Sequence, residues 1–126
     1  MKISRKTDLP KMIDIPGGEK IQEILGLVAR NVTSHSLAEI TILPGNASSR
    51  HYHKFSEESY LILSGEATLD INDRIFTLKP EEAVLIEPLE IHQISNQSAE
   101  ELVFIAVCVP AWSPDDSFDV EKESRK

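Results

Sequence analysis

The sequence predicts an all-β protein, either a sandwich or a barrel, and two observations lead to this prediction. From residue 37 onwards, short segments with apolar or alternating side chains recur at regular intervals, and clusters of turn residues separate them. No segment shows a convincing helical period. A chain of 126 residues is one ordinary domain, which buries about two-thirds of the surface that its unfolded form would expose.

Residues 1–20 are expected to form an irregular N-terminal arm, because prolines and the pair Gly17-Gly18 interrupt them. One short strand is expected near residues 12–15, and the apolar side chains there would pack on the body or on a partner subunit. The next segment, residues 21–29, could form a helix, but Gly26 and its β-branched residues favour a strand.

The clearest strand pattern lies at residues 37–43, where Ala38, Ile40 and Ile42 share one face. Asn72-Asp73 is typical of the tight turn of a β-hairpin. Further strands are expected at residues 50–53, 58–63, 67–71, 74–76, 83–86, 91–95 and 101–109. The chain thus divides into the arm 1–20, a β-barrel over residues 21–110 and a C-terminal tail 111–126, all in a single domain. In that tail, Trp112 is expected to pack the tail down rather than cover a barrel mouth, and residues 120–126 are expected to fray.

The formal net charge of −8 argues against a nucleic acid or an anionic membrane as a partner bound through a general basic field. Cys108 is the single cysteine, so no internal disulfide forms, and its apolar surroundings predict a small buried side chain. The basic start of the chain is not followed by the apolar segment of a signal peptide, and the longest apolar run is too short to cross a bilayer. The cytoplasm is therefore the expected compartment.

The strongest chemical signal is the pair His51 and His53, with Glu58 five residues further on. Side chains two residues apart on an extended segment point to the same side, so both imidazoles could face one metal ion. Two imidazoles and a carboxylate are common ligands of divalent transition metals. His92 could join them only through the fold. Alone, the histidine pair could also be a coincidence at the surface.

These residues resemble the first motif of the cupin superfamily, because Gly45, His51, His53, Glu58 and Gly65 stand at its spacing. The resemblance is to small single-domain cupins of type 2, which are loosely described as mannose-6-phosphate isomerase-like, and it covers roughly residues 37–109.

The second cupin motif is only partly kept. His92 and Asn96 stand at the family spacing, but Glu81, Glu87 and Leu89 replace a glycine, a proline and a glycine. Glycine at such positions allows a positive φ, so the replacements imply either a turn of another type or a strained one.

The resemblance implies a double-stranded β-helix, or jelly-roll barrel, of two antiparallel sheets. It also implies one divalent metal, Mn, Fe, Ni, Zn, Co or Cu, on His51, His53, Glu58 and His92. Glu57 is the rival of Glu58, but the six residues between Glu58 and Gly65 favour Glu58.

Two further residues are candidates for contacts with a substrate. Tyr60 lies two residues beyond Glu58 on the same strand face, so its hydroxyl could act in catalysis on a bound ligand. Arg50 precedes the first ligand and could bind an anionic substrate. His35 is expected at the surface.

These observations suggest a metal-dependent enzyme that acts on a small polar metabolite, either a sugar or sugar-phosphate isomerase or an O2-using dioxygenase. The alternative is a non-catalytic module that binds or senses a small molecule. The apolar arm and the apolar last strand also predict a homodimer, formed by strand exchange or by stacking of sheets.

Overall fold

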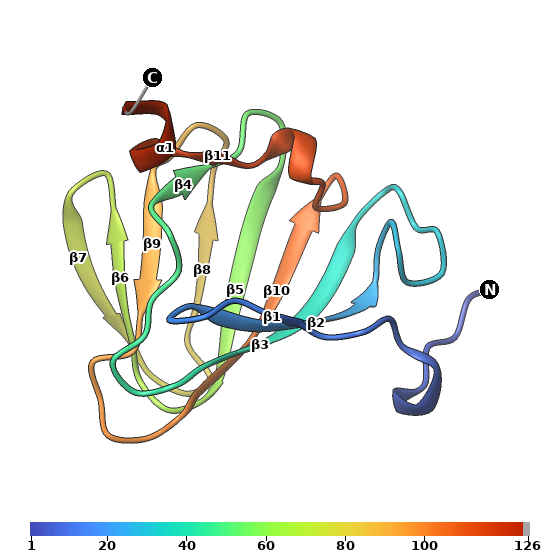
Figure 1. Ribbon diagram of the computed structural model, residues 1–126, viewed down its shortest axis with the longest axis horizontal. Coiled ribbons are helices and arrows are strands. Elements are labelled where there is room, and N and C mark those ends of the chain that lie inside the picture. Colours follow the sequence, from blue (N-terminus) through green and yellow to red (C-terminus); the bar gives the residue numbers. More distant parts are fainter. Residues whose placement is uncertain (125–126) are drawn as a thin grey trace.

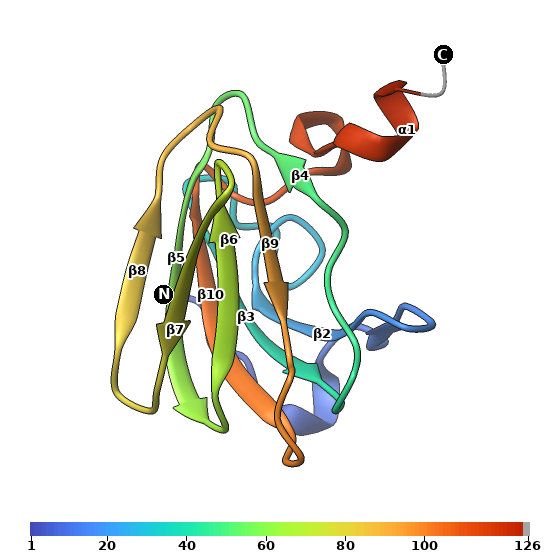
Figure 2. The ribbon, with the colours of Figure 1, turned by 90° about the vertical axis from the view of Figure 1, so that its left-hand side faces the viewer.

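Residues 1–124, which the computed structural model describes, fold into a six-stranded and a five-stranded antiparallel sheet that face each other (Figures 1 and 2). The six-stranded sheet contains, in spatial order, β1 (Ile13–Asp14), β2 (Glu19–Leu25), β3 (Ser36–Ile42), β10 (Leu102–Val109), β5 (Glu57–Ser64) and β8 (Ala83–Ile86). The five-stranded sheet contains β11 (Phe118–Asp119), β4 (His51–Tyr52), β9 (His92–Ser95), β6 (Ala67–Ile71) and β7 (Arg74–Leu78). The predicted all-β fold and the double-stranded β-helix are therefore confirmed.

The core lies between the two sheets, because alternate residues of each strand point inward. In β10, Leu102, Phe104, Ala106 and Cys108 are buried, whereas the residues between them are partly exposed. Each fully buried large apolar side chain stabilises the fold by about 1.5–3 kcal/mol. The same alternation in β5 directs Glu58 into the barrel and leaves Glu57 exposed.

Two turns show why particular residues occupy them. Asn72 and Asp73 have φ angles of 49° and 68°, as the predicted hairpin between β6 and β7 requires. Gly65 has a φ of +80°, and a Cβ there would lie 2.3 Å from the carbonyl oxygen of Glu101. Only glycine fits at that position without a shift of the backbone.

The altered second motif keeps the backbone conformation that glycine would take. Glu81 and Leu89 have φ angles of 72° and 73°, in the left-handed region that disfavours residues with a Cβ. The predicted strain is therefore present at these two positions. The backbone N–H of Leu89 donates a 2.7 Å hydrogen bond to the carbonyl of His53, so this turn supports a predicted metal ligand.

The C-terminal segment is folded as far as Ser124, although the sequence predicted fraying from residue 120. A 3-10 turn, η2 (Pro114–Asp116), leads into β11, which pairs with β4, and residues Val120–Ser124 form the short helix α1. Figure 1 shows this segment passing the upper end of the barrel beside β4. The last two residues of the predicted frayed tail lie outside the described part of the chain.

The N-terminal arm contains the 3-10 turn η1 (Lys6–Asp8) and β1, which pairs with β2 as the outermost strand of the larger sheet. The predicted strand near residues 12–15 is confirmed, and so is the strand rather than a helix after residue 19. Within residues 1–124, none of the helices has the length and apolar character that spanning a bilayer needs. The homodimer stays a prediction.

Candidate metal centre

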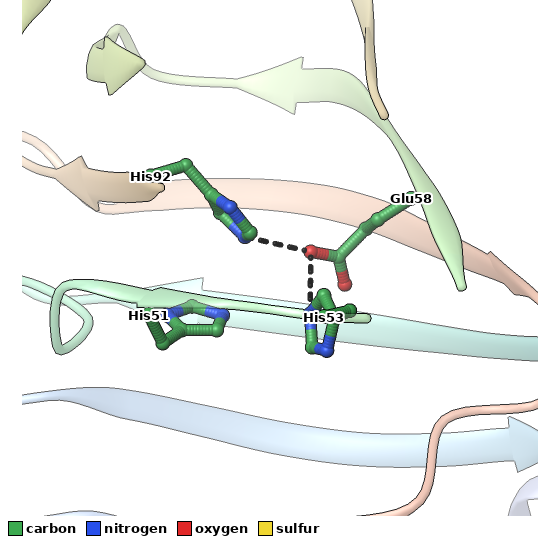
Figure 3. Close-up of side chains that lie close together, drawn as sticks. All are labelled: His51, His53, Glu58 and His92. Atoms are coloured by element: carbon green, nitrogen blue, oxygen red, sulfur yellow. Dashed lines mark hydrogen bonds and ion pairs between the residues drawn. The ribbon is translucent and has the colours of Figure 1, made fainter. Parts of the chain in front are cut away.

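The fold brings the four predicted metal ligands together at one end of the barrel. His51 in β4 lies directly opposite His92 in β9, and Glu58 comes from the facing sheet. Each of His51, His53, Glu58 and His92 offers one ligand atom, and these atoms lie within 4.8 Å of one another. Figure 3 shows the three imidazoles and the carboxylate directed toward one another. We call these four residues the ligand cluster.

Backbone carbonyls fix the orientation of all three imidazoles. Each Nδ1 lies 2.8–2.9 Å from a carbonyl oxygen, that of Ser49 for His51, of Asp116 for His53 and of Glu90 for His92. Because a carbonyl only accepts, each Nδ1 carries the proton and each Nε2 is directed to the interior. This is the arrangement in which proteins present a neutral imidazole to a metal.

The Nε2 of His53 provides a test of whether a metal fits here. This atom is buried and has no hydrogen-bond partner among the described residues, and it lies 3.6 Å from Oε1 of Glu58. A buried polar atom without a partner costs about 1–3 kcal/mol. A divalent cation among the four ligand atoms would supply the missing partner, so the donor set and the burial both fit a transition metal.

Glu58 is held by side chains on the inner wall of the barrel. The Tyr60 hydroxyl donates a 2.8 Å hydrogen bond to its Oε1, and the Cys108 thiol donates one of 3.2 Å to its Oε2. Burial raises the pKa of Glu58, but the imidazoles of His53 and His92 outweigh it and hold this pKa well below its ordinary value. The carboxylate is therefore ionised and ready to bind a cation.

The pKa values of two imidazoles move in opposite directions. Burial is the main cause that lowers the pKa of His51 to about 4, and the neighbouring His92 lowers it further. This ring is therefore neutral at neutral pH. Burial also acts to lower the pKa of His53, but the adjacent Glu58 carboxylate outweighs it and raises this pKa. In the metal-free protein a proton therefore competes with a metal at His53.

Asp116 contacts a predicted metal ligand, and the sequence did not indicate this contact. Its backbone carbonyl accepts the hydrogen bond from His53, and its carboxylate accepts backbone hydrogen bonds from Lys54, Phe55 and Ser56. Burial raises the pKa of Asp116, but these backbone donors outweigh it and lower this pKa. Ser113 followed by a proline is a recognisable cap for η2, but nothing local in the sequence connects that turn to a histidine 63 residues earlier.

The other predicted site residues have different surroundings. Tyr60 is buried, lines the cavity described below, and has its hydroxyl engaged with Glu58. Arg50 forms ion pairs with Asp70 and Asp73 at 3.1 and 3.3 Å, so the structure gives no support to its predicted contact with a substrate. Cys108 is buried as predicted, although its hydrogen bond to Glu58 was not foreseen.

A cavity of about 470 Å³ opens beside the ligand cluster. Of the ligand cluster, His51 and Glu58 line this cavity, together with Tyr60 and Cys108. Trp112 also lines it, so this side chain borders the cavity where the sequence predicted that it packs the tail down. The cavity is large enough for a metabolite that reaches the ligand cluster.

A family model described as cupin domain matches residues 38–108. The chain is 29% identical over 100 residues to an uncharacterized protein of Methanocaldococcus jannaschii, and the match covers 79% of this chain and 80% of that protein. It is also 27% identical over 101 residues to the polyketide synthase CurC of Streptomyces cyaneus, covering 73% of this chain and 64% of that protein.

Among solved structures, the chain is similar to a putative sugar phosphate isomerase from Acidithiobacillus ferrooxidans, with a TM-score of 0.63 and 26% identity. That match covers 75% of this chain and 61% of the other. The chain thus spans under two-thirds of the length of this protein and of CurC.

Proposed function

The chain belongs to the cupin domain family, and on this premise we propose that it is a metal-dependent enzyme acting on a small metabolite. The observation that carries the proposal is the buried Nε2 of His53, which has no hydrogen-bond partner among residues 1–124 and lies in a cluster that borders a cavity. A structural metal site is closed by protein ligands, whereas a catalytic site keeps positions open for water or substrate. A cavity beside the ligand cluster supports the catalytic kind.

The chain's own residues prepare the site for a cation. Asp116 holds the ring of His53 in place, while Tyr60 and Cys108 orient the two carboxylate oxygens of Glu58. Three imidazoles and one carboxylate suit Fe, Mn, Ni, Co, Cu or Zn. When bound, such a cation would polarise a carbonyl or hydroxyl oxygen of the substrate.

The charges around the cavity bear on the substrate. Among the described residues that line the cavity, one is a lysine, Lys11, and three are glutamates, Glu19, Glu23 and Glu58. Apart from a bound cation and its ligand Glu58, a phosphate dianion would meet the two carboxylates of Glu19 and Glu23 against one ammonium, and Arg50 already pairs with two aspartates. A substrate without a phosphate therefore matches the cavity better than a sugar phosphate does.

The similar proteins do not decide between reactions, because one is described as a polyketide synthase and another as a putative sugar phosphate isomerase. An isomerase and an O2-using dioxygenase differ in their need for a redox-active metal. Identifying the bound metal is therefore the first step toward the reaction.

The test is elemental analysis of protein purified without added metal, comparing His92→Ala with His35→Ala. His35 lies outside the ligand cluster and its Nδ1 contacts the hydroxyl of Ser34, so its variant is the matched control. We expect close to one metal per chain in the wild type and in His35→Ala, and a loss in His92→Ala. Equal metal content in the two variants would contradict the proposed site.

A non-catalytic module that binds or senses a metabolite is the second candidate, and a cavity beside a metal would serve it equally well. Screening the metal-loaded protein against small carbonyl and hydroxyl compounds separates the two candidates. Steady turnover that His92→Ala abolishes supports the enzyme, whereas saturable binding without conversion supports the module.

A further inference from the structure

The walls of the cavity are mainly apolar. Among the side chains that line it are Ile13, Ile15, Ile21, Ile40, Ala106 and Trp112. Most of them come from the arm and from the neighbouring strands β2, β3 and β10 of the six-stranded sheet, and Trp112 follows Pro110, so they form a continuous apolar wall. Contact with an apolar molecule would release water from this surface, and that release favours binding.

Most polar groups in the cavity already have partners. The Glu23 carboxylate accepts backbone hydrogen bonds from Val28 and Ala29, and Tyr60 and Cys108 both donate to Glu58. These groups hold the protein together and are not free to bind a substrate.

Glu19 is different. It lies at the start of β2, on the same strand face as Ile21 and Glu23, and all three line the cavity. Its carboxylate makes no hydrogen bond or ion pair within residues 1–124. Burial is the main cause that raises the pKa of Glu19 to about 7. The nearby Glu58 also raises this pKa, and His92 acts to lower it. A carboxylate that lines a cavity without a partner can act as a general base and, once protonated, as a general acid.

Resting on the proposed function, we propose that the cavity takes a ring-sized, mainly apolar carbonyl compound and that Glu19 is the residue that transfers its proton. The Glu19 carboxylate and two members of the ligand cluster, His51 and Glu58, line the same mainly apolar cavity. The substrate carbonyl would lie at the ligand cluster and its carbon skeleton against the isoleucines.

The proton transfer is balanced without a further reactant. The Glu19 carboxylate takes a proton from the carbon next to the carbonyl, and the electron pair of that C–H bond forms a C–C double bond as charge moves to the oxygen. Glu19, now a carboxylic acid, returns a proton to the same carbon or to another carbon of a conjugated system. The first outcome exchanges hydrogen and the second isomerises the compound, with no net oxidation.

The experiment uses 1-tetralone, a bicyclic ketone, as the probe for metal-loaded protein in D2O. Binding is followed by calorimetry, and deuterium uptake at the carbon next to the carbonyl is followed by mass spectrometry. We expect uptake faster than in buffer, and a fall of about 100-fold or more in Glu19→Gln, the size of a general-base contribution. Glu39→Gln, an exposed glutamate on β3, is the matched control and should keep the wild-type rate.

One further variant and two further results test the substrate class and the role of Glu19. Ile13→Asp places a charge on the exposed arm, where Ile13 is 48% exposed, and should weaken binding of 1-tetralone without loss of the fold or of metal. Tight binding of glucose 6-phosphate in place of 1-tetralone would overturn the substrate class. Binding of 1-tetralone with uptake no faster than in buffer would overturn the role of Glu19.

The metal-free protein separates this inference from the proposed function. If the protein takes up no metal, the proposed enzyme fails. Binding of 1-tetralone by that protein, weakened by Ile13→Asp, would still support an apolar cavity, and no binding would overturn it.

Discussion

The Nδ1–H of His53 donates a 2.8 Å hydrogen bond to the backbone carbonyl of Asp116, 63 residues further along the chain. The carboxylate of the same aspartate accepts hydrogen bonds from three successive backbone N–H groups that follow His53. The C-terminal segment therefore positions a predicted metal ligand, and it is part of the site rather than an appendage.

The first prediction concerns Asp116→Ala, which leaves those three donors without their acceptor. Because hydrogen bonds to a charged group contribute about 1.5–3 kcal/mol each, we expect a loss of roughly 2 kcal/mol or more in the free energy of unfolding. Metal affinity should fall about 10–100-fold, as for other residues that orient a ligand. Urea unfolding and competition with a chelator measure the two effects.

Asp115→Ala is the control, because this neighbour is exposed and lies outside the network around His53. It should change both quantities little. Equal losses in the two variants would mean that the turn as a whole, and not the Asp116 carboxylate, holds the ligand loop.

The second prediction separates Glu58 from Glu57. Glu58 is 6% exposed and belongs to the ligand cluster, whereas Glu57 is exposed at the start of β5. We expect Glu58→Gln to lose bound metal, since it replaces an ionised ligand by a neutral amide, and Glu57→Gln to keep it. Elemental analysis of both proteins decides, and metal loss confined to Glu57→Gln would show that the register assigned to this strand is wrong.

Much of the fold and of the ligand cluster could be predicted from the sequence because the signals are local. Strand alternation places Glu58, Tyr60 and Ile62 inward, and the spacing of the first motif identifies His51 and His53. Such patterns depend on geometry that each strand carries by itself.

The remaining features depend on contacts between distant segments. The sequence does not show that Asp116 meets His53, nor that the arm and β2 carry Glu19 to the wall of the cavity. The apolar lining of the cavity likewise forms only when separate segments come together, so the sequence does not show it.

The third prediction concerns strain in the second motif. Leu89 has a φ of 73° and a side chain that is 64% exposed, so Leu89→Gly removes backbone strain and little packing. We expect the free energy of unfolding to rise by about 0.5–1 kcal/mol. Glu87→Gly, at a position without a positive φ, should lower it by a similar amount, and urea unfolding of the two variants compares them. A destabilised Leu89→Gly would show that the leucine side chain outweighs the strain.

The fourth prediction concerns the homodimer. Apolar side chains on the outer face of the six-stranded sheet, Leu61, Leu63, Leu85 and Val109, are 41–50% exposed, and stacking of two sheets would cover them. We expect a dimer in light scattering and a monomer for Leu85→Lys. Ile75→Lys, on β7 of the other sheet, is the control and should leave the mass unchanged. A wild-type protein that is monomeric at high concentration would remove the prediction.

The fifth prediction is a pH dependence of stability caused by Glu19. Burial, followed by Glu58, raises its pKa from 4.5 to about 7 in the folded chain. Between these values the folded chain holds a proton that the unfolded chain has released. The resulting stabilisation is fully present below pH 4.5 and is lost as the pH rises to about 7, by roughly 3 kcal/mol at most.

Glu19→Gln isolates this contribution, because the amide does not titrate while other groups change equally in both proteins. Urea unfolding of the two metal-free proteins should therefore show the variant gaining stability relative to the wild type as the pH rises from 4.5 to about 7, with little change above. A constant difference across this range would mean that Glu19 keeps an ordinary pKa. Its carboxylate would then be ionised near neutral pH, where it could accept a proton but would hold none to give.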